Sequence, residues 1–462
     1  MKLTDVLALQ LKKNKIESAF GLQGGAVVHI FDSLEKYDIN VTYTYHEECA
    51  SFAAAANSKI TGKPGCVIVT TGPGSTNAMT GLLGAWQDSI PCIFISGQVR
   101  SEHMSYGLKV RQVGTQELNI LDIVKPITKK TFLVKDKKTM KDQIDEAIMT
   151  CISGRPGPVW VDLPLDLQWT DIDIKKKDII KVEKQKNIPL RKIDLISFSK
   201  MLNHAKSPLF ILGYGIRLSG YLSKVQNFLK EYSFRFVTTW TASDYFATKH
   251  PQNIGIIGMR GQRGANLALF ESDMLICLGT HLSIPHTTTL TETFSPQSEK
   301  IIVNIDYNQL ENLSIDYDLK INSDLGDFFK GLENISFNKY EKNNFDIYKS
   351  LNWYEPKEKT LPNPNSYFRK LSSGSPTSSC FVVDGGGTAL YAGFQSVFIK
   401  KNQRIICSSA ISSMGSGLGE VVGVHNAKKF NSIFLIIGDG SFLMNIQDLQ
   451  SIRSQNIPAI IS

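Results

Sequence analysis

The 462-residue sequence lacks long apolar runs, paired-cysteine motifs and a secretory leader. No apolar stretch reaches the roughly 20 residues that a transmembrane helix needs. The seven cysteines are scattered, odd in number and free of Cys-x-x-Cys spacing, which argues against a disulfide framework and a zinc site. The N-terminus enters an amphipathic helix directly, without a signal-peptide core. We therefore expect a cytoplasmic protein with reduced thiols.

The basic excess is concentrated rather than spread along the chain. Much of the net charge of +8 comes from two Lys-rich stretches, residues 175–186 and 339–359. A nucleic-acid surface would need a basic stripe interleaved with aromatic residues, or a known module, and the sequence has neither. The two stretches are interpreted as solvated linkers, and neither a nucleic acid nor a membrane is expected as a partner.

Short apolar runs alternate with helical patterns from one end of the chain to the other. This alternation predicts α/β layers built around doubly wound parallel sheets. Polar stretches at residues 171–192 and 334–365 divide the pattern into three blocks, which cover residues 1–170, 193–333 and 366–462. We expect each block to be one domain and the two polar stretches to be linkers.

The segment from Ile433 to Ser441 is the most informative part of the sequence. Residues 433–437 are apolar and predict a buried parallel strand. The strand leads into the turn Gly438-Asp439-Gly440-Ser441, and apolar spacing from Ser441 to Ile452 predicts one following helix. Glycines allow a ligand to approach the backbone closely, and an aspartate offers Mg²⁺ a hard oxygen ligand. The turn therefore predicts a site for a cation bound to phosphate.

Two motifs in the first block could carry chemistry or serve structure alone. Glu47 and Glu48 follow a predicted strand and open an Ala-rich helix, where acids in the first turn complement the helix dipole. Gly72-Pro73-Gly74 has the composition of a strand-to-helix turn. Taken alone, neither motif identifies a site.

Together, short motifs follow one another in a specific order along the chain: Gly24-Gly25, His46-Glu47, Thr71-Gly72-Pro73-Gly74, Asp88-Ser89-Ile90-Pro91, Ser96-Gly97-Gln98-Val99, Gln116-Glu117, Asp162-Leu163-Pro164, Ser413-Met414-Gly415-Ser416-Gly417-Leu418 and Gly438-Asp439-Gly440-Ser441. This series resembles the thiamine diphosphate-dependent enzymes of the acetolactate synthase type, and specifically their large catalytic subunit. The resemblance covers nearly the whole chain. It is weakest in the central block, which matches mainly in its pattern.

The resemblance implies a pyrimidine-binding domain, a central domain and a diphosphate-binding domain, in that order. It implies thiamine diphosphate and Mg²⁺ as cofactors, and a decarboxylating carboligase, a transferase or lyase, that acts on a 2-oxo acid such as pyruvate. In that family the cofactor lies between two subunits, so a homodimer or homotetramer is expected. Glu47 would be the catalytic residue, because in the family this glutamate hydrogen-bonds the aminopyrimidine ring and favours its imino tautomer.

Further residues receive roles from the same resemblance. Met414 would be the apolar wedge that bends the cofactor, although a core methionine is the alternative. Gln116 would line the substrate channel, and Asp439 would bind the metal. The remaining cofactor-binding residues would be Gly24, Gly25, Pro73, Gly386, Gly387, Thr388, Gly415, Gly438, Gly440 and Ser441.

The sequence departs from the family pattern at several positions. Thr115 stands where these enzymes have a bulky aromatic residue, which should widen the acceptor side. His281 replaces an arginine of the flavin region and two following acids are absent, which argues against FAD, although Gly258-Met259-Arg260-Gly261 keeps part of the flavin pattern and leaves FAD as an alternative. Thr388-Ala389 replaces Gln-His, and Leu418-Gly419-Glu420 replaces Leu-Pro-Ala. These changes favour, as an alternative, acetyl transfer from pyruvate to a keto-sugar in surface-polysaccharide synthesis.

The end of the sequence raises a second alternative. The family's second Mg²⁺ ligand, an asparagine, lies further along than Ser462. We therefore expect the third domain to be incomplete and the chain to be C-terminally truncated. Either the sequence is a fragment of an active enzyme or it is a catalytically inactive homologue.

Overall fold

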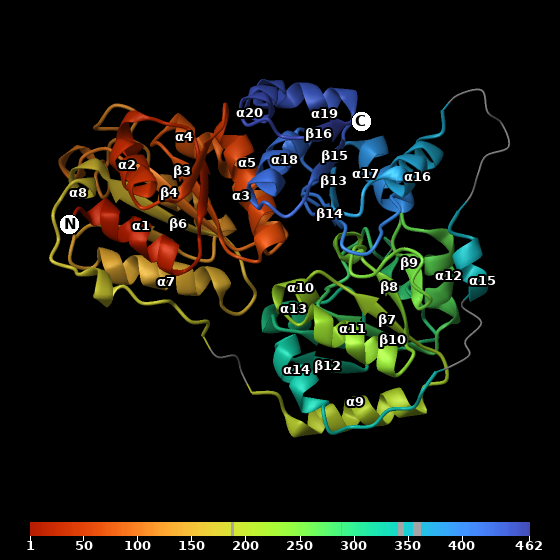
Figure 1. The fold of residues 1–462 in the computed structure, drawn as a ribbon. Helices are drawn as coiled ribbons and strands as arrows, with labels where there is room; N and C mark the ends of the chain where they lie inside the picture. The colour runs from red at the N-terminus through yellow and green to blue at the C-terminus, as the bar shows by residue number, and fades with distance from the viewer. Residues whose placement is uncertain (186–188, 288, 341–345, 354–361) are drawn as a thin grey trace. The chain divides into compact units, whose positions relative to one another are not determined.

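The computed structural model describes residues 1–185, 189–287, 289–340, 346–353 and 362–462 (Figure 1). They form two compact units. The first comprises Met1–Gln185, Cys380–Gly386 and Ile406–Ser462, and the second comprises Lys186–Ser379 and Gly387–Ile405. Both predicted linkers lie partly outside the described residues. No helix of the described chain combines the length and the apolar character that crossing a membrane requires.

A six-stranded parallel sheet forms the N-terminal part of the first unit. Its strand order is β2-β1-β3-β4-β6-β5. The strands are short and largely buried, as in parallel sheets covered on both faces. Their bounds are Ser18–Gly21 (β1), Asn40–Tyr43 (β2), Gly65–Val69 (β3), Cys92–Gln98 (β4), Thr131–Leu133 (β5) and Val159–Pro164 (β6).

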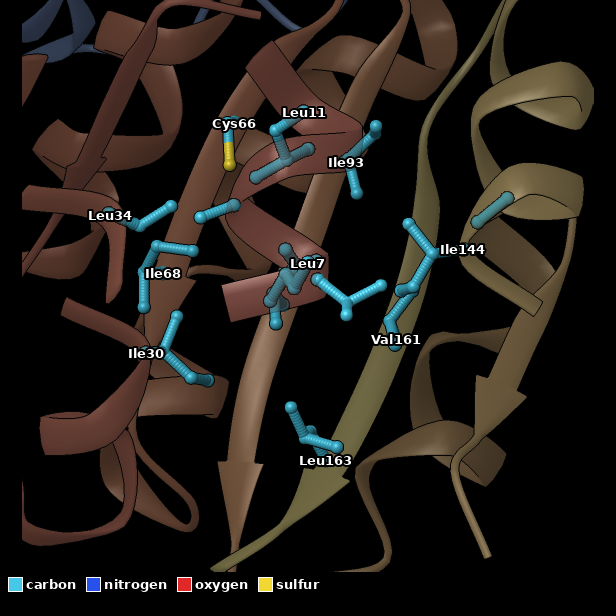
Figure 2. Packing of buried hydrophobic residues seen from close by; sticks show 14 of the residues in the cluster. Leu7, Leu11, Ile30, Leu34, Cys66, Ile68, Ile93, Ile144, Val161 and Leu163 are labelled. Carbon is cyan, nitrogen blue, oxygen red and sulfur yellow. The ribbon is translucent and has the colours of Figure 1, made fainter. Parts of the chain in front are cut away.

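Helix α1 (Leu3–Lys13) contributes Leu7 and Leu11 to the core of this part. Figure 2 shows these side chains among Ile68 of β3, Ile93 of β4 and Val161 of β6. The flanking helices α2 and α7 complete the same cluster. The other helices here are α2 (Val28–Lys36), α3 (Glu47–Thr61), α4 (Pro73–Asn77), α5 (Met79–Gln87), α6 (Ile120–Val124), α7 (Met140–Ile152) and α8 (Leu165–Gln168), with 3-10 helices at Gly25–Val27, Ser101–His103 and Lys125–Ile127.

A four-stranded parallel sheet of order β14-β13-β15-β16 lies in the C-terminal part of the chain. Its strands are Ser379–Val383 (β13), Arg404–Ile406 (β14), Ser432–Ile436 (β15) and Ala459–Ile461 (β16). The predicted turn after β15 is present. The helices of the first unit in this part are α18 (Ser416–Asn426), α19 (Asp439–Met444) and α20 (Leu449–Ser454), with the 3-10 helix η7 at Ile446–Asp448. Helices α16 (Pro364–Gly374) and α17 (Gly387–Ser396) belong to the second unit.

The prediction of one continuous helix from Ser441 to Ile452 is wrong. Helix α19 ends at Met444, and Asn445 has a non-helical backbone with φ −128° and ψ 34°. The Asn445 side chain donates a hydrogen bond to the Gly415 carbonyl, 3.2 Å away. This contact between distant parts of the sequence accompanies the break, and the apolar spacing of the segment carries no sign of it.

Helices α3 and α18 pack with their backbones in close contact inside the first unit. A Cβ atom added to Gly419 would lie 2.7 Å from the Cys49 carbonyl oxygen, and one added to Gly423 would lie 2.0 Å from that of Ala53. These two glycines share one face of α18 because they are four residues apart.

The second unit contains a six-stranded parallel sheet of order β12-β11-β10-β7-β8-β9. Its strands are Pro208–Leu212 (β7), Arg235–Thr238 (β8), Asn253–Ile256 (β9), Met274–Leu278 (β10), Glu299–Asn304 (β11) and Leu319–Asn322 (β12). The helices are α9 (Lys192–His204), α10 (Gly215–Leu218), α11 (Leu222–Glu231), α12 (Arg263–Glu271), α13 (Tyr307–Glu311), α14 (Leu325–Gly331) and α15 (Asp346–Ser350). Three parallel sheets confirm the predicted fold class. The exact domain boundaries stay a prediction.

Candidate functional site

Glu47 opens helix α3 and its carboxyl group is oriented by a neighbouring helix. The side chain is only 6% exposed. Asn77, at the end of α4, donates a hydrogen bond from Nδ2 to Glu47 Oε2 at 3.0 Å. A Cβ atom on Gly74 would lie 3.3 Å from Glu47 Oε1. The turn at Gly74 therefore keeps the second carboxyl oxygen uncrowded, while Asn77 fixes the first.

Sequence reasoning did not assign Asn77 to the site. Asn77 follows the Gly72-Pro73-Gly74 turn in the sequence, and no local motif marks it as a site residue. Local spacing could not show its partner, because Glu47 is 30 residues away in the sequence.

Gly24, Gly25 and Pro73 lie just beyond the carboxyl ends of β1 and β3, which are neighbours in the sheet. In open parallel sheets this edge is where ligands bind. Gly24 packs against Thr70, so that a Cβ atom there would be 2.6 Å from Thr70 Cβ, whereas one on Gly25 would meet nothing within 4 Å. Pro73 occupies the first helical position of α4, where its missing N–H carries no penalty.

Asp384 follows β13 and holds the turn that precedes α18. Its carboxylate accepts hydrogen bonds from the backbone amides of Gly417 at 2.8 Å and Gly415 at 3.4 Å. Burial raises the pKa of Asp384, and the Ser441 hydroxyl together with the amides of Gly417, Gly415 and Gly386 opposes the rise. Asp384 thus organises the turn that carries Met414.

Four of the glycines predicted to bind the cofactor, Gly386, Gly415, Gly438 and Gly440, lie around this turn. A Cβ atom on Gly386 would lie 2.9 Å from Ser441 Oγ, and one on Gly440 would lie 3.7 Å from Met414 Cε. Gly415 has φ +90°, which glycine adopts without strain. Gly438 faces open space, since a Cβ atom there would meet nothing within 4 Å.

Met414 is 40% exposed, which does not fit a core methionine. Ser416, two residues later, is buried, and its hydroxyl oxygen has no hydrogen-bond partner within the described chain. A buried polar atom without a partner is rare in proteins. The turn therefore presents an apolar side chain to the surface and an unused hydroxyl beside it.

Asp439 is exposed at the start of α19, and its Oδ1 accepts a hydrogen bond from the Gly440 amide at 2.9 Å. Across the described residues, no group of three or more His, Cys, Asp or Glu side chains is arranged to hold a metal ion. One aspartate can serve Mg²⁺ only together with phosphate oxygens and water.

The first unit connects the start of α3 to the segment after β15. The Tyr45 amide donates a hydrogen bond to Asp448 Oδ1 at 3.0 Å. Burial raises the pKa of Glu48, while His46 and the Asn445 side chain lower it. Asn445 also binds the Gly415 carbonyl. The helix that carries Glu47 and the turn that carries Met414 are thus joined through Asn445.

Two predicted cofactor-binding residues and the predicted channel residue lie outside the turn that carries Met414. Gly387 and Thr388 begin α17, which belongs to the second unit, and their role stays a prediction. Gln116 is exposed and adopts φ +63°. Its carbonyl oxygen lies 3.2 Å from the Thr71 hydroxyl, beside the turn that ends at Pro73.

Three segments of the chain match the domains of one family. Residues 1–123 match the thiamine pyrophosphate enzyme N-terminal TPP binding domain, residues 197–332 the central domain and residues 385–462 the C-terminal TPP binding domain.

Individual relatives agree with these matches. The acetolactate synthase large subunit of Buchnera aphidicola subsp. Acyrthosiphon pisum is 31% identical, over 96% of this chain and 79% of its own length. The acetolactate synthase isozyme 2 large subunit of Escherichia coli K12 is 29% identical, over 97% of this chain and 80% of its own length. The chain therefore belongs to the thiamine pyrophosphate enzyme family and is an acetolactate synthase-like member of it.

Proposed function

We propose that the chain is a thiamine diphosphate- and Mg²⁺-dependent carboligase that decarboxylates a 2-oxo acid such as pyruvate. The observation that carries this proposal is the buried Glu47 carboxyl, whose Oε2 is oriented by Asn77 and whose Oε1 is left uncrowded by Gly74. A carboxyl fixed in this way can exchange a proton with a ring nitrogen at a defined atom. Thiamine diphosphate, when bound, supplies the carbanion chemistry that decarboxylation needs.

The residues near Asp384 fit a diphosphate group. The unused Ser416 hydroxyl is a donor without a partner inside the described chain, and the Gly438 turn leaves open space above its backbone. Gly386, Gly415, Gly440 and Ser441 would bind the diphosphate, and Asp439 would bind the accompanying Mg²⁺. Met414 would press an apolar surface against the bound cofactor.

The flavin-region residues of the second unit do not fit FAD. His286 lies close to His281, and burial lowers its pKa to about 4, with His281 contributing. His286 is therefore neutral near pH 7 and supplies no positive charge beside His281, the residue that stands where related enzymes have an arginine. We propose that FAD is not required.

A second candidate concerns the acceptor. Thr115, which replaces a bulky aromatic residue, is small and exposed next to Gln116. This leaves room on the acceptor side for a substrate larger than a second pyruvate. Acetyl transfer from pyruvate to a keto-sugar is therefore the alternative reaction.

We also propose that the active form is a homodimer or homotetramer. Leu443 and Met444 of α19 are exposed, like the neighbouring Met414. Exposed apolar side chains clustered at a ligand site are typical of a surface that a partner covers.

The decisive experiment titrates the purified protein with thiamine diphosphate and Mg²⁺ and then measures pyruvate consumption. We expect saturable binding that requires Mg²⁺ and that Asp439→Ala weakens. Asp306→Ala, at an N-cap in the second unit, serves as the matched control and should bind normally. Absence of binding would contradict the proposal. Binding without pyruvate consumption would favour a catalytically inactive homologue, and pyruvate turnover only with a keto-sugar present would favour the alternative acceptor.

A further inference from the structure

The segment that carries Gln116, residues 99–119, runs from the end of β4 to the start of α6. It contains the 3-10 helix η2 (Ser101–His103) and no strand. Glu117 ties the segment to itself, because its carboxylate accepts hydrogen bonds from the Ser105 amide at 2.9 Å and the Val113 amide at 3.0 Å. These contacts shape the segment internally. Its attachment to the sheet depends on other residues.

Asp162 of β6 is the buried end of that attachment. Its side chain is completely buried, and the sheet register places it beside Ser96 of β4. Its carboxylate accepts hydrogen bonds from Ser96 Oγ at 2.6 Å, Gln98 Nε2 at 3.0 Å and Tyr106 Oη at 2.9 Å. Tyr106 belongs to the segment itself. One carboxylate therefore binds two residues of the sheet and one of the segment.

Gln98 connects Asp162 to the residues around Gln116. Its Nε2 also donates to the Leu118 carbonyl at 2.8 Å, and its Oε1 accepts from the Thr71 hydroxyl at 2.8 Å. The same hydroxyl lies 3.2 Å from the carbonyl oxygen of Gln116. Gln98 therefore contacts two groups near Gln116, the Leu118 carbonyl and the Thr71 hydroxyl.

The backbone of Gln116 needs such support. Its φ of +63° is uncommon for a residue other than glycine, and such conformations persist where the surroundings enforce them. Gly72 packs onto the same position, since a Cβ atom there would lie 2.5 Å from the Gln116 carbonyl oxygen. The direction of the exposed Gln116 side chain is therefore set by its backbone conformation. The contacts of its carbonyl oxygen with Thr71 and Gly72 hold that conformation.

We propose that Asp162 is a positioning residue that fixes Gln116 beside the Gly72 turn, through Gln98, Thr71 and Tyr106, and thereby sets the affinity for the 2-oxo acid. The effect on substrate rests on the proposed function; the effect on the segment does not. An ionised carboxylate accepts from all three donors together, and the Ser96 hydroxyl, which accepts from Trp160 Nε1 at 2.8 Å, keeps its own proton to donate to Asp162.

The protonation state of Asp162 agrees with this role. Burial raises its pKa to about 6, with a further rise from the charge of Glu117, while hydrogen bonds from Ser96, Gln98 and Tyr106 oppose the rise. The carboxylate is therefore ionised above neutral pH, where three acceptor contacts can form together.

Limited trypsin digestion of the full-length protein tests the positioning role. Lys109 and Arg111 are exposed cleavage sites within the segment. Asp162→Asn keeps the size of the side chain but loses an acceptor, so we expect cleavage there to be about tenfold faster, which corresponds to one lost buried hydrogen bond. Tyr106→Phe, which removes a single hydroxyl from the segment, should act in the same direction and guards against misfolding of Asp162→Asn.

Steady-state kinetics with pyruvate, thiamine diphosphate and Mg²⁺ test the consequence for substrate. We expect Asp162→Asn to raise KM for pyruvate about tenfold while kcat stays within about twofold and thiamine diphosphate binding is unchanged. Asp166→Asn is the matched control: this half-buried carboxylate accepts a hydrogen bond from the Ser101 amide at 2.8 Å, at the start of the same segment. Its KM should equal that of the unaltered protein.

The outcomes separate the two proposals. If the unaltered protein does not consume pyruvate, the proposed function fails, while the cleavage rates still decide whether Asp162 holds the segment. Equal cleavage rates for the unaltered protein, Asp162→Asn and Tyr106→Phe would overturn the inference. A lower kcat at unchanged KM in Asp162→Asn would overturn it as well.

Discussion

The Nζ atom of Lys59, on α3, lies 3.1 Å from Oδ2 of Asp88, and both side chains are buried. Asp88 also accepts hydrogen bonds from the amides of Ser409 at 3.1 Å and Ala410 at 3.0 Å. Lys59 additionally lies 3.5 Å from Glu420 Oε1 and donates to the Cys407 carbonyl. A single buried cation thus joins α3 to the chain that leads from β14 into α18.

Lys59→Met should destabilise the protein strongly. Removing one partner leaves Asp88 and Glu420 buried without their cation, which typically costs about 3–5 kcal/mol. Urea unfolding would measure the loss. Lys12→Met is the control, because Lys12 forms an exposed pair with Asp38 at 3.1 Å, and exposed pairs contribute about 1 kcal/mol or less. Equal effects of the two substitutions would contradict the role of Lys59.

Glu420 should make stability depend on pH. Burial raises its pKa from 4.5 to about 7, with Asp384 and Asp88 contributing and Lys59 opposing. The folded state therefore keeps a proton that the unfolded state has already lost. Stability from this group is complete below about pH 4.5 and is lost as pH rises through about 7, by about 2 kcal/mol between pH 5.5 and 8.

Unfolding free energies measured across that range, for the unaltered protein and for Glu420→Gln, would test this expectation. The glutamine variant cannot titrate and should show a shallower slope between pH 6 and 8. The buried Asp162, whose pKa is about 6, has lost most of its proton over this pH range, so its titration contributes little to the slope. Identical slopes in both proteins would show that Glu420 does not titrate in this range.

Glu47→Gln should uncouple cofactor binding from cofactor activation. The amide keeps the contact with Asn77 but cannot exchange the proton, so we expect release of the thiazolium C2 proton to slow about 10²- to 10⁴-fold. Deuterium exchange at C2, followed by NMR, measures this step directly. Glu48→Gln is the matched neighbour, with its carboxyl near Asn445 instead, and should change exchange far less. Unchanged exchange in Glu47→Gln would refute the catalytic assignment.

Met414→Ala should lower activity more than stability. The side chain is 40% exposed, so truncation should cost well below the roughly 2–5 kcal/mol of a core methionine. The wedge role predicts a larger loss in kcat than in thiamine diphosphate affinity. Thermal unfolding and steady-state kinetics measured together would separate the roles. A large drop in melting temperature with normal kcat would favour a packing role.

Elements with a strong local pattern can be predicted from the sequence. The apolar run before Gly438 and the Ala-rich helix after His46 both occur as expected. The short strands β5, β9 and β12, each only three or four residues long, carry no comparable apolar run. The helical stretch that follows the Gly72 turn divides at Ala78 into α4 and α5. The bounds of short or interrupted elements depend on tertiary contacts, and the local sequence pattern carries no information on those contacts.

The residues of the candidate site also divide into those that a local motif predicts and those whose role depends on contacts between distant segments. Glycines and acids that follow strands were recognisable because strand ends in parallel sheets share an edge. The residues that orient them were not recognisable. Asn77 reaches Glu47 from another helix, and Asp384 reaches the amide of Gly417 across 33 residues. Neither contact leaves a periodic signal in the sequence.

The backbone contact between α3 and α18 sets a limit on sequence variation. Gly419 and Gly423 leave no volume for a methyl group against the Cys49 and Ala53 carbonyls, so every other residue there would push the two helices apart. Homologues or library variants that keep this arrangement should change the two positions only when the facing backbone moves as well. In a saturation-mutagenesis map, the two glycines should therefore be as intolerant as a catalytic residue, although neither takes part in chemistry.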